Sequence, residues 1–413
     1  MSSLIKRSLA TLACVCIGTS PVLANVITDW DETGVTIVAG ISPYTGQRLM
    51  TMMHIAMFDA VNSIERRYRP YLVQLPAAPG TSKEAAAVAG AILATIDAKS
   101  AEKIKTLVTS YLASIPDDAR KADAIALGQA VAARVLEARD HDGADAPDAY
   151  RPRTTAGVYV PTTITAASMW PGMKPFALAK ASQFRPAPPI SLKSDEWATN
   201  YNEMKEYGKN ASVKRSPQQT ETARFWLMVG PPAYHPIARQ LVQTKQMSVV
   251  DSARFMTLVA IALNDALIAV YDVKYHYNFW RPITAIRNGD IDENPATERD
   301  ATWQPIGVTP LHPEYPCAHC ISSGAVVAVV EALLGTADIP EVAMSSATAP
   351  GVTHRWTNTA ALAEEVANAR VWAGFHYRFS TRVGSEMGRR VGEHVVRSIL
   401  QADNPVATGA NKR

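Results

Sequence analysis

The chain has 413 residues, of which 47% are hydrophobic and 19% are charged. This balance excludes an intrinsically disordered chain, and the length allows one large hydrophobic core or two modest ones. The formal net charge is only +3, so the chain lacks the broad basic surface of a nucleic-acid-binding protein.

The N-terminus has the pattern of a secretory signal peptide over residues 1–24. Lys6 and Arg7 precede an apolar stretch at residues 9–18, and small residues follow up to Ala24. This pattern predicts cleavage and export, to the periplasm or out of the cell. A retained membrane anchor is the weaker alternative, because the apolar stretch is too short to span a bilayer.

Residues 25–192 are predicted to form a helical bundle. After a mixed, turn-rich stretch at residues 25–46, apolar residues recur at helical spacing in four segments joined by short links, which favours an antiparallel arrangement. The four segments are residues 48–66, 81–99, 101–115 and 117–139. His54 and Asp59 lie in the first segment, where we expect them to be hydrogen-bonded inside the packed helix.

A long proline-rich stretch at residues 140–192 interrupts the helical pattern. Such loops are usually functional or wrap a neighbouring element. Trp170, Phe176 and Phe184 indicate that this loop packs against the protein. We expect it to form part of an active-site wall or a contact between two copies of the chain.

Helical signals resume over residues 193–402, which are predicted to form a second helical domain. The predicted helices span residues 194–209, 218–228, 235–244, 249–277, 322–335, 358–373 and 380–402. Strand signals are few, so the fold class is predicted to be all-α, with two helical bundles and a flexible tail at residues 403–413. The longest apolar stretch contains Asp265 and Asp272, so no stable membrane insertion is expected.

The stretch from Asp265 to Gly289 carries the first part of a candidate anion site. Lys274 and Arg281 lie seven residues apart, which is two helical turns, so both cations are predicted to converge on one anion. Because Arg281 precedes a proline, the helix is predicted to end or kink there and to leave the guanidinium at the rim of a pocket.

Two later stretches supply further groups. Residues 316–319 open an apolar run that is predicted to be helical, so its first backbone N–H groups would face a bound anion. Arg370 and His376 add a guanidinium and an imidazole, and their spacing places His376 just past a helix end. Together with His319, these cations and imidazoles suit a highly charged tetrahedral oxyanion.

Two cysteines, Cys317 and Cys320, flank His319. A three-residue separation at a helix start brings the Cα atoms near disulfide range, and an exported protein would allow pairing. Two inert buried thiols remain an open alternative, and a metal or redox site is a weaker one.

The three motifs, in this order, resemble those of the acid phosphatase and vanadium haloperoxidase superfamily, whose pattern is Lys-x6-Arg-Pro, then Pro-Ser-Gly-His, then Ser-Arg-x5-His. The first motif is complete here, and the resemblance covers about residues 258–392. The departures are Cys317 for serine, Ala318 for glycine and Ala369 for serine. The flanking residues 278–280, 312–315 and 377–379 look like the haloperoxidase branch.

The resemblance implies a C-terminal domain of acid phosphatase/haloperoxidase type that binds vanadate, or phosphate if the protein is a phosphatase. In such a site His376 would bond vanadium, His319 would be the acid–base residue, and Lys274 would polarise bound peroxide. The groups expected around the oxyanion are Lys274, Arg281, Cys317, Ala318, Arg370 and His376.

The haloperoxidase-like flanks favour an oxidoreductase that uses hydrogen peroxide to oxidise halide. Bromide is predicted over chloride, because His312 stands where bromide-oxidising members carry a second histidine. An exported acid phosphatase that cleaves a phosphate ester through a phosphohistidine at His376 is the first alternative, and a non-catalytic oxyanion-binding protein is the second.

Ser380 stands where many members have an aspartate that could orient the neighbouring histidine. Members of the family often associate, so a homo-oligomer is compatible with the resemblance.

Overall fold

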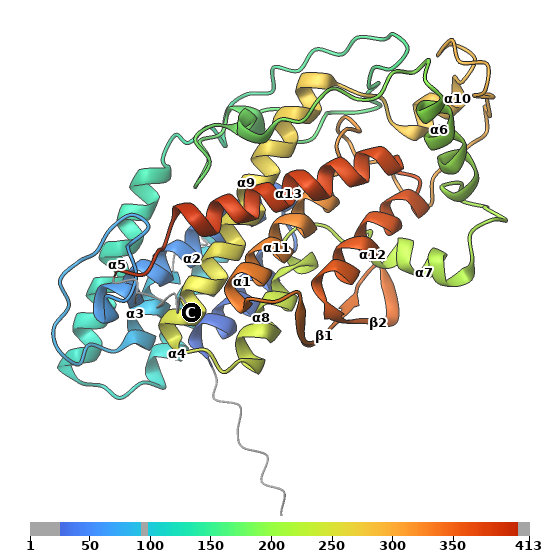
Figure 1. The fold of residues 1–413 in the computed structure, drawn as a ribbon. Helices are drawn as coiled ribbons and strands as arrows, with labels where there is room; N and C mark the ends of the chain where they lie inside the picture. The colour runs from blue at the N-terminus through green and yellow to red at the C-terminus, as the bar shows by residue number, and fades with distance from the viewer. Residues whose placement is uncertain (1–24, 92–97, 404–413) are drawn as a thin grey trace, which may run out of the picture.

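Helix α9, Val249–Tyr277, runs through the centre of the computed structural model, which describes residues 25–91 and 98–403 (Figure 1). The Ser248 side chain caps its first turn, and Asn278 ends it in the left-handed conformation with φ of 52°. By length and composition α9 could cross a membrane, but 89% of its most apolar window is buried inside the protein. Its hydrophobic surface is therefore used for packing.

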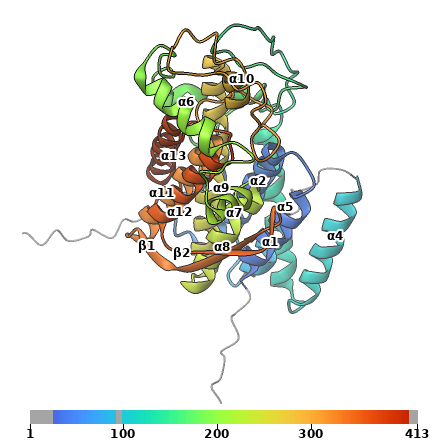
Figure 2. The same ribbon diagram turned by 90° about the vertical axis from the view of Figure 1, so that its right-hand side faces the viewer.

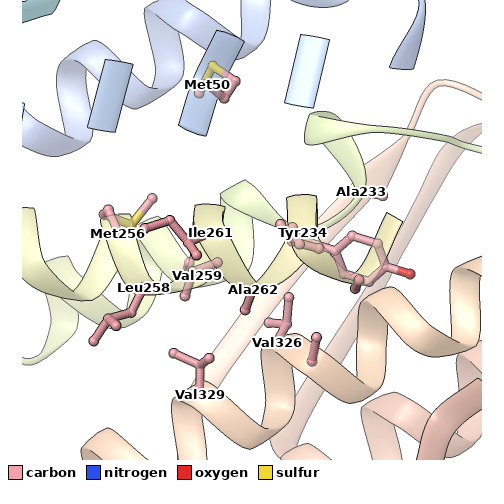
Figure 3. Packing of buried hydrophobic residues seen from close by; sticks show 14 of the residues in the cluster. Met50, Ala233, Tyr234, Met256, Leu258, Val259, Ile261, Ala262, Val326 and Val329 are labelled. Carbon is pink, nitrogen blue, oxygen red and sulfur yellow. The ribbon is translucent and has the colours of Figure 1, made fainter. Parts of the chain in front are cut away.

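Helices from both halves of the chain pack against α9. Helix α2 (Pro43–Glu65) contacts it from the N-terminal half, and α11 (Ala318–Leu334) and α13 (Arg378–Ser398) contact it from the C-terminal half. Figure 3 shows α9 side chains between Met50 of α2 and Val329 of α11. One continuous hydrophobic cluster includes residues of both predicted bundles, and the boundary at residue 193 stays a prediction.

The predominantly helical fold class is confirmed, and the predicted helices are present with shifts of a few residues at their ends. The N-terminal half also contains α3 (Lys83–Gly90), α4 (Ala98–Ala113) and α5 (Ala119–Arg139), with α4 at the outer edge in Figure 2. The C-terminal half also contains α6 (Asp195–Tyr207), α7 (Pro217–Phe225), α8 (His235–Thr244), α10 (Pro282–Arg287) and α12 (Thr359–Trp372). The predicted signal peptide, residues 92–97 of one predicted helix and most of the predicted tail lie outside the described residues.

Helix α1, Val26–Val38, occupies the stretch that was predicted to be turn-rich. This prediction was wrong because Gly34 and many β-branched residues lower the helix propensity of the segment, whereas tertiary packing decides its structure. A Cβ atom added at Gly34 would lie 2.7 Å from the Met50 sulfur, so the glycine allows α1 to approach α2 closely.

A β-hairpin, β1 (Asp338–Ser346) and β2 (Ala349–Asn358), is the second element that the sequence did not predict. The strands are antiparallel, with Val342 opposite Trp356. The Gln240 side chain of α8 bonds both backbone groups of Ala343 at 2.7 and 2.9 Å. Contacts from a distant helix therefore help to hold a short strand pair that is weak by itself.

Asp31 of α1 is buried beside His54 of α2 and His235 of α8. Its Oδ1 lies 2.9 Å from His54 Nε2 and 2.6 Å from His235 Nδ1, while its Oδ2 accepts a hydrogen bond from Arg239 at 2.7 Å. These three residues could hold a metal ion, because their ligand-type atoms lie within 4.8 Å of one another. Two ligand atoms of one tetrahedral ion, however, would be about 3.3 Å apart. The Asp31–His54 and Asp31–His235 distances of 2.9 and 2.6 Å are shorter, and with the adjacent arginine they indicate a hydrogen-bonded ion pair, as hydrogen bonding was predicted for His54.

Residues 140–192 pack against the protein, as predicted. The Asp265 carboxylate of α9 accepts hydrogen bonds from the backbone N–H groups of residues 176–178 at 2.7 to 2.9 Å. Tyr275 donates to the Ala166 carbonyl, and Ala166 lies on the wall of the cavity described below. The loop therefore forms part of that wall.

Candidate functional site

A cavity of about 570 Å³ opens where the C-terminal half of α9 meets the first turn of α11. Loops at residues 227–230 and 307–312 form its mouth, and the segment between α12 and α13 forms part of its floor. Of the predicted site residues, those that line it are His312, Ala318, His319, Arg370 and His376. The sequence therefore identified the three histidines and the arginine that line this cavity.

Lys274 is fully buried but does not line the cavity. Its ammonium group donates to the carbonyl oxygens of Pro313, Glu314 and Pro316 at 2.5 to 3.0 Å. An ammonium has three protons, so all of them are used by this loop. Lys274 and Arg281 converge on the backbone of residues 312–316. Helical spacing is not the reason, because α9 ends at Tyr277, between the two residues.

Arg281 lies beneath the cavity rather than at its rim, because only 1% of its surface is exposed. Its guanidinium donates to the carbonyl oxygens of His312 and Phe375 at 2.8 and 3.0 Å. It also lies 2.9 Å from His312 Nδ1 and 3.3 Å from His376 Nε2. The prediction of a rim position was wrong because Arg281, which stands at the start of α10, is covered by the 312–316 loop and by Phe375.

His376 lies between α12 and α13, just past a helix end as predicted. Its Nδ1 is 2.9 Å from Glu314 Oε1, and the same oxygen accepts a hydrogen bond from the Tyr377 backbone N–H. A carboxylate at Nδ1 selects the tautomer with the proton on that atom, which leaves Nε2 as a lone-pair donor. This Nε2 is the nitrogen beside Arg281.

Glu314 is the functional residue whose role the sequence reasoning missed. It is fully buried, and burial raises its pKa to about 7. The carboxylate that orients His376 therefore comes from the loop before α11. The nearby Ser380 hydroxyl lowers the pKa of Glu314.

His319 stands in the first turn of α11. Its Nε2 lies 2.9 Å from the Met228 carbonyl oxygen, which only accepts, so the ring donates there and Nδ1 remains for proton transfer. Burial and then the nearby Arg370 hold the pKa of His319 well below its usual range. The Ala318 and His319 backbone N–H groups have no intrahelical partners because they belong to the first turn.

Cys317 and Cys320 form a disulfide with Cα atoms 5.3 Å apart. This settles the alternatives that the sequence left open. Cys317 Sγ also accepts a hydrogen bond from the Cys320 backbone N–H, so it caps α11. Cys317 was expected among the groups around the oxyanion, but a disulfide sulfur has no proton to donate, and Cys317 does not line the cavity.

Arg370 is the predicted cation best placed to hold an anion. It lines the cavity, it is 2% exposed, and it donates one hydrogen bond to the Trp226 carbonyl. Its buried Nε has no hydrogen-bond partner among the described residues. The ring of Phe375 lies 4.9 Å from the guanidinium carbon and fixes its direction.

The electrostatics of the site favour a bound anion. Three cations, Lys274, Arg281 and Arg370, are buried beside the single carboxylate of Glu314 in this part of the described chain. Burial and then repulsion by Arg281 hold the pKa of Lys274 well below its usual range, and burial lowers the pKa of Arg370 to about 9. An oxyanion would relieve these costs, so the residues present fit vanadate or phosphate.

The surroundings of the cavity histidines favour their neutral form. Burial and then Arg281 hold the pKa values of His312 and His376 well below the usual range. A neutral imidazole is the form that ligates a metal or attacks phosphorus.

Residues 254–404 match the family model described as VCPO second helical-bundle domain. A vanadium chloroperoxidase from Curvularia inaequalis is 29% identical over 145 residues, an alignment that covers 29% of this chain and 23% of that protein. The chain thus spans less than a quarter of the length of this curated relative.

Solved structures share the fold over nearly the whole chain. A bacterial vanadium-dependent iodoperoxidase superposes with a TM-score of 0.76 at 23% identity, covering 92% of this chain and 96% of that chain. An apo-type bacterial vanadium-dependent chloroperoxidase gives 0.70 at 15% identity, with 87% and 95% covered. Both matches extend through the N-terminal helices that the family model does not include.

Proposed function

We propose that the chain is a vanadate-dependent haloperoxidase-type oxidoreductase, because residues 254–404 match the model of the VCPO second helical-bundle domain and the chain shares the fold of bacterial vanadium-dependent haloperoxidases. The observation that carries the proposal is the surroundings of His376. Its Nδ1 is held by a buried carboxylate, while its Nε2 lies beside a buried arginine in a cavity that also presents Arg370 and His319.

Each group has a role that follows from its contacts. Arg370 and the first backbone N–H groups of α11 would hold the oxygens of the oxyanion. Arg281 would donate a hydrogen bond to the same oxyanion from its place beside His376 Nε2. His376 Nε2 would bind vanadium. His319 Nδ1 would carry the protons that peroxide reduction consumes. Lys274 supports the site by holding the 312–316 loop in place.

Bound vanadate would supply the activation of hydrogen peroxide toward attack by halide. The Cys317–Cys320 disulfide supports this oxidative chemistry over a phosphatase, because the site then has no thiol for an oxidant to consume. We propose bromide over chloride, since the neutral His312 ring lines the cavity 2.9 Å from Arg281. We also propose export of the protein, on the basis of residues 1–24.

The test is a paired assay. Purified apo-protein is titrated with vanadate and assayed with peroxide and chloride, bromide or iodide, and separately for hydrolysis of a phosphate monoester. The expected result is halide oxidation, with bromide above chloride, only after vanadate loading. Hydrolysis that vanadate inhibits would instead assign a phosphatase, and vanadate binding without either activity would assign an oxyanion-binding protein.

His376→Ala tests the assignment of the central histidine. Because this change removes the nitrogen that would bind vanadium, halide oxidation should fall to the background rate. The variant should still fold, which thermal unfolding checks. Unchanged turnover in a folded His376→Ala protein would refute the assignment.

A further inference from the structure

We propose that Met228 is a site of oxidative modification, at which hypohalous acid leaving the cavity converts the thioether to a sulfoxide and thereby lowers the activity of the protein. The source of the oxidant rests on the proposed function, whereas the exposure of Met228 and its link to His319 do not. The inference comes from the place of Met228 at the cavity mouth and from the hydrogen bond that its carbonyl oxygen accepts.

Met228 differs from the other methionines in its position. Most methionines that the structure describes are buried, whereas Met169, Met228 and Met247 are partly exposed. Of these three, Met228 is the one whose two chain neighbours, Leu227 and Val229, both line the cavity. Val229 is 50% exposed, so this stretch lies at the opening. An oxidant that leaves the cavity therefore passes the Met228 thioether.

The oxidation of this thioether balances without a further reagent. Thiols are the side chains that oxidants attack most readily, but the two cysteines of the described residues, Cys317 and Cys320, are joined in a disulfide. The Met228 sulfur gives up two electrons and forms a bond to oxygen, while the oxygen–halogen bond of hypohalous acid breaks. One thioether and one hypohalous acid thus give one sulfoxide, one halide ion and one proton.

The backbone at and beside Met228 holds two residues of the site. The Met228 carbonyl oxygen accepts a hydrogen bond from His319 Nε2 at 2.9 Å, and the Trp226 carbonyl oxygen accepts one from Arg370. Trp226 is fully buried, and its indole N–H donates to Glu365 at 2.9 Å. Residue 226 is therefore fixed on two sides, so a change at Met228 should act on His319 more than on Arg370.

Oxidation changes how the Met228 side chain packs. The apolar thioether contacts the hydrophobic core from a partly exposed position, whereas a sulfoxide is polar and favours water. The oxidised side chain turns toward solvent, and the carbonyl oxygen of the same residue moves away from His319 Nε2. His319 then loses the contact that fixes its tautomer, so proton transfer at Nδ1 becomes less efficient.

The first test locates the oxidation. Vanadate-loaded protein turns over peroxide and bromide, apo-protein receives a single equivalent of hypobromite, and peptide mass spectrometry measures the sulfoxide at each methionine. Met228 should be oxidised ahead of buried methionines such as Met57 in both samples, and during turnover also ahead of Met169 and Met247. Oxidation of Met228 no faster than that of Met57, or equal oxidation of the three exposed methionines during turnover, would overturn the proposal. Absence of halide oxidation, with Met228 still oxidised first by hypobromite, would refute the proposed function but not the susceptibility of Met228.

The second test links the sulfoxide to activity. Each protein is compared with its own activity before hypobromite treatment, in whichever assay of the pair above detects turnover. Wild type should lose about tenfold in kcat, which is part of the contribution of about 100-fold or more that a positioned acid–base group makes. Met228→Leu should keep its starting activity because leucine has no thioether, and the control Met247→Leu should lose activity as wild type does. An equal loss in wild type and Met228→Leu would overturn the proposal.

Histidine ¹⁵N spectra of the apo-protein separate this effect from a general loss of structure. His319 should carry its proton on Nε2 before oxidation and populate both tautomers afterwards, while His376, whose Nδ1 is held by Glu314, should not change. Methionine sulfoxide reductase should restore kcat and the His319 spectrum together. A sulfoxide at Met228 with an unchanged His319 tautomer, or equal changes at both histidines, would overturn the link between Met228 and His319.

Discussion

Replacing Glu314 with glutamine should weaken vanadate binding, because the His376 ring would no longer be held in the tautomer with the proton on Nδ1. The side chains of Glu314 and His376 are 0% and 1% exposed, and Oε1 lies 2.9 Å from Nδ1. A hydrogen bond to a buried charged group contributes about 1.5–3 kcal/mol. A free-energy change of 1.4 kcal/mol corresponds to a tenfold change in a dissociation constant. Partners that orient a metal ligand typically alter metal affinity by about 10- to 100-fold. The vanadate Kd should therefore rise by about 10- to 100-fold.

Glutamine is the appropriate substitution because it keeps the volume of the side chain. Alanine would in addition leave a cavity and remove the oxygen that accepts from His376 Nδ1 and the Tyr377 N–H, and this further loss of stability would confuse the result. Glu314→Asp keeps the charge but withdraws it by about 1.5 Å, the length of one C–C bond. This second variant separates loss of charge from loss of contact.

The assay has two readouts at pH 8, where Glu314 with its pKa of about 7 is ionised. Calorimetric titration gives the vanadate Kd, and ¹⁵N spectra of labelled histidine show which His376 nitrogen carries the proton. Wild type should carry it on Nδ1, and Glu314→Gln should populate both tautomers. Glu341→Gln is the matched control, because that carboxylate is 54% exposed on β1. A Kd within twofold of wild type and an unchanged tautomer would refute the reasoning.

Three further outcomes follow from the contacts. Arg370→Lys should raise the vanadate Kd about tenfold because the guanidinium fork is lost, while Arg355→Lys on the exposed hairpin should not change it. His312→Gln removes an imidazole whose pKa is lower in the folded than in the unfolded protein. Wild type therefore loses stability as pH falls from 6.5 to 5.5, and in denaturant unfolding the variant should lose about 1 kcal/mol less over the same range. Asp31→Asn should lower the free energy of unfolding by about 3 kcal/mol, since Arg239 loses its buried partner. A metal chelator should leave the melting temperature of vanadate-free wild type unchanged, because the Asp31 cluster holds no metal.

The helices and the identity of the site were accessible from the sequence because both depend on short-range rules. A period of 3.6 residues marks a helix wherever it packs, and the extent of α9 was predicted to the residue. The three motifs in order were enough to place Arg370, His319 and His376 in one cavity. Helix α1 and the β-hairpin were missed because their local propensities are weak and distant contacts stabilise them.

What each buried charge contacts was decided only by the tertiary structure. Lys274 and Arg281 were expected to converge through helical spacing, but α9 ends between them, and their hydrogen-bond partners come from the 312–316 loop, 31 to 42 residues further along. Glu314 became the partner of His376 across 62 positions. Short-range patterns fix how a helix forms, whereas a buried polar group takes whichever partner the packing brings within about 3 Å, and the sequence alone does not contain that distance.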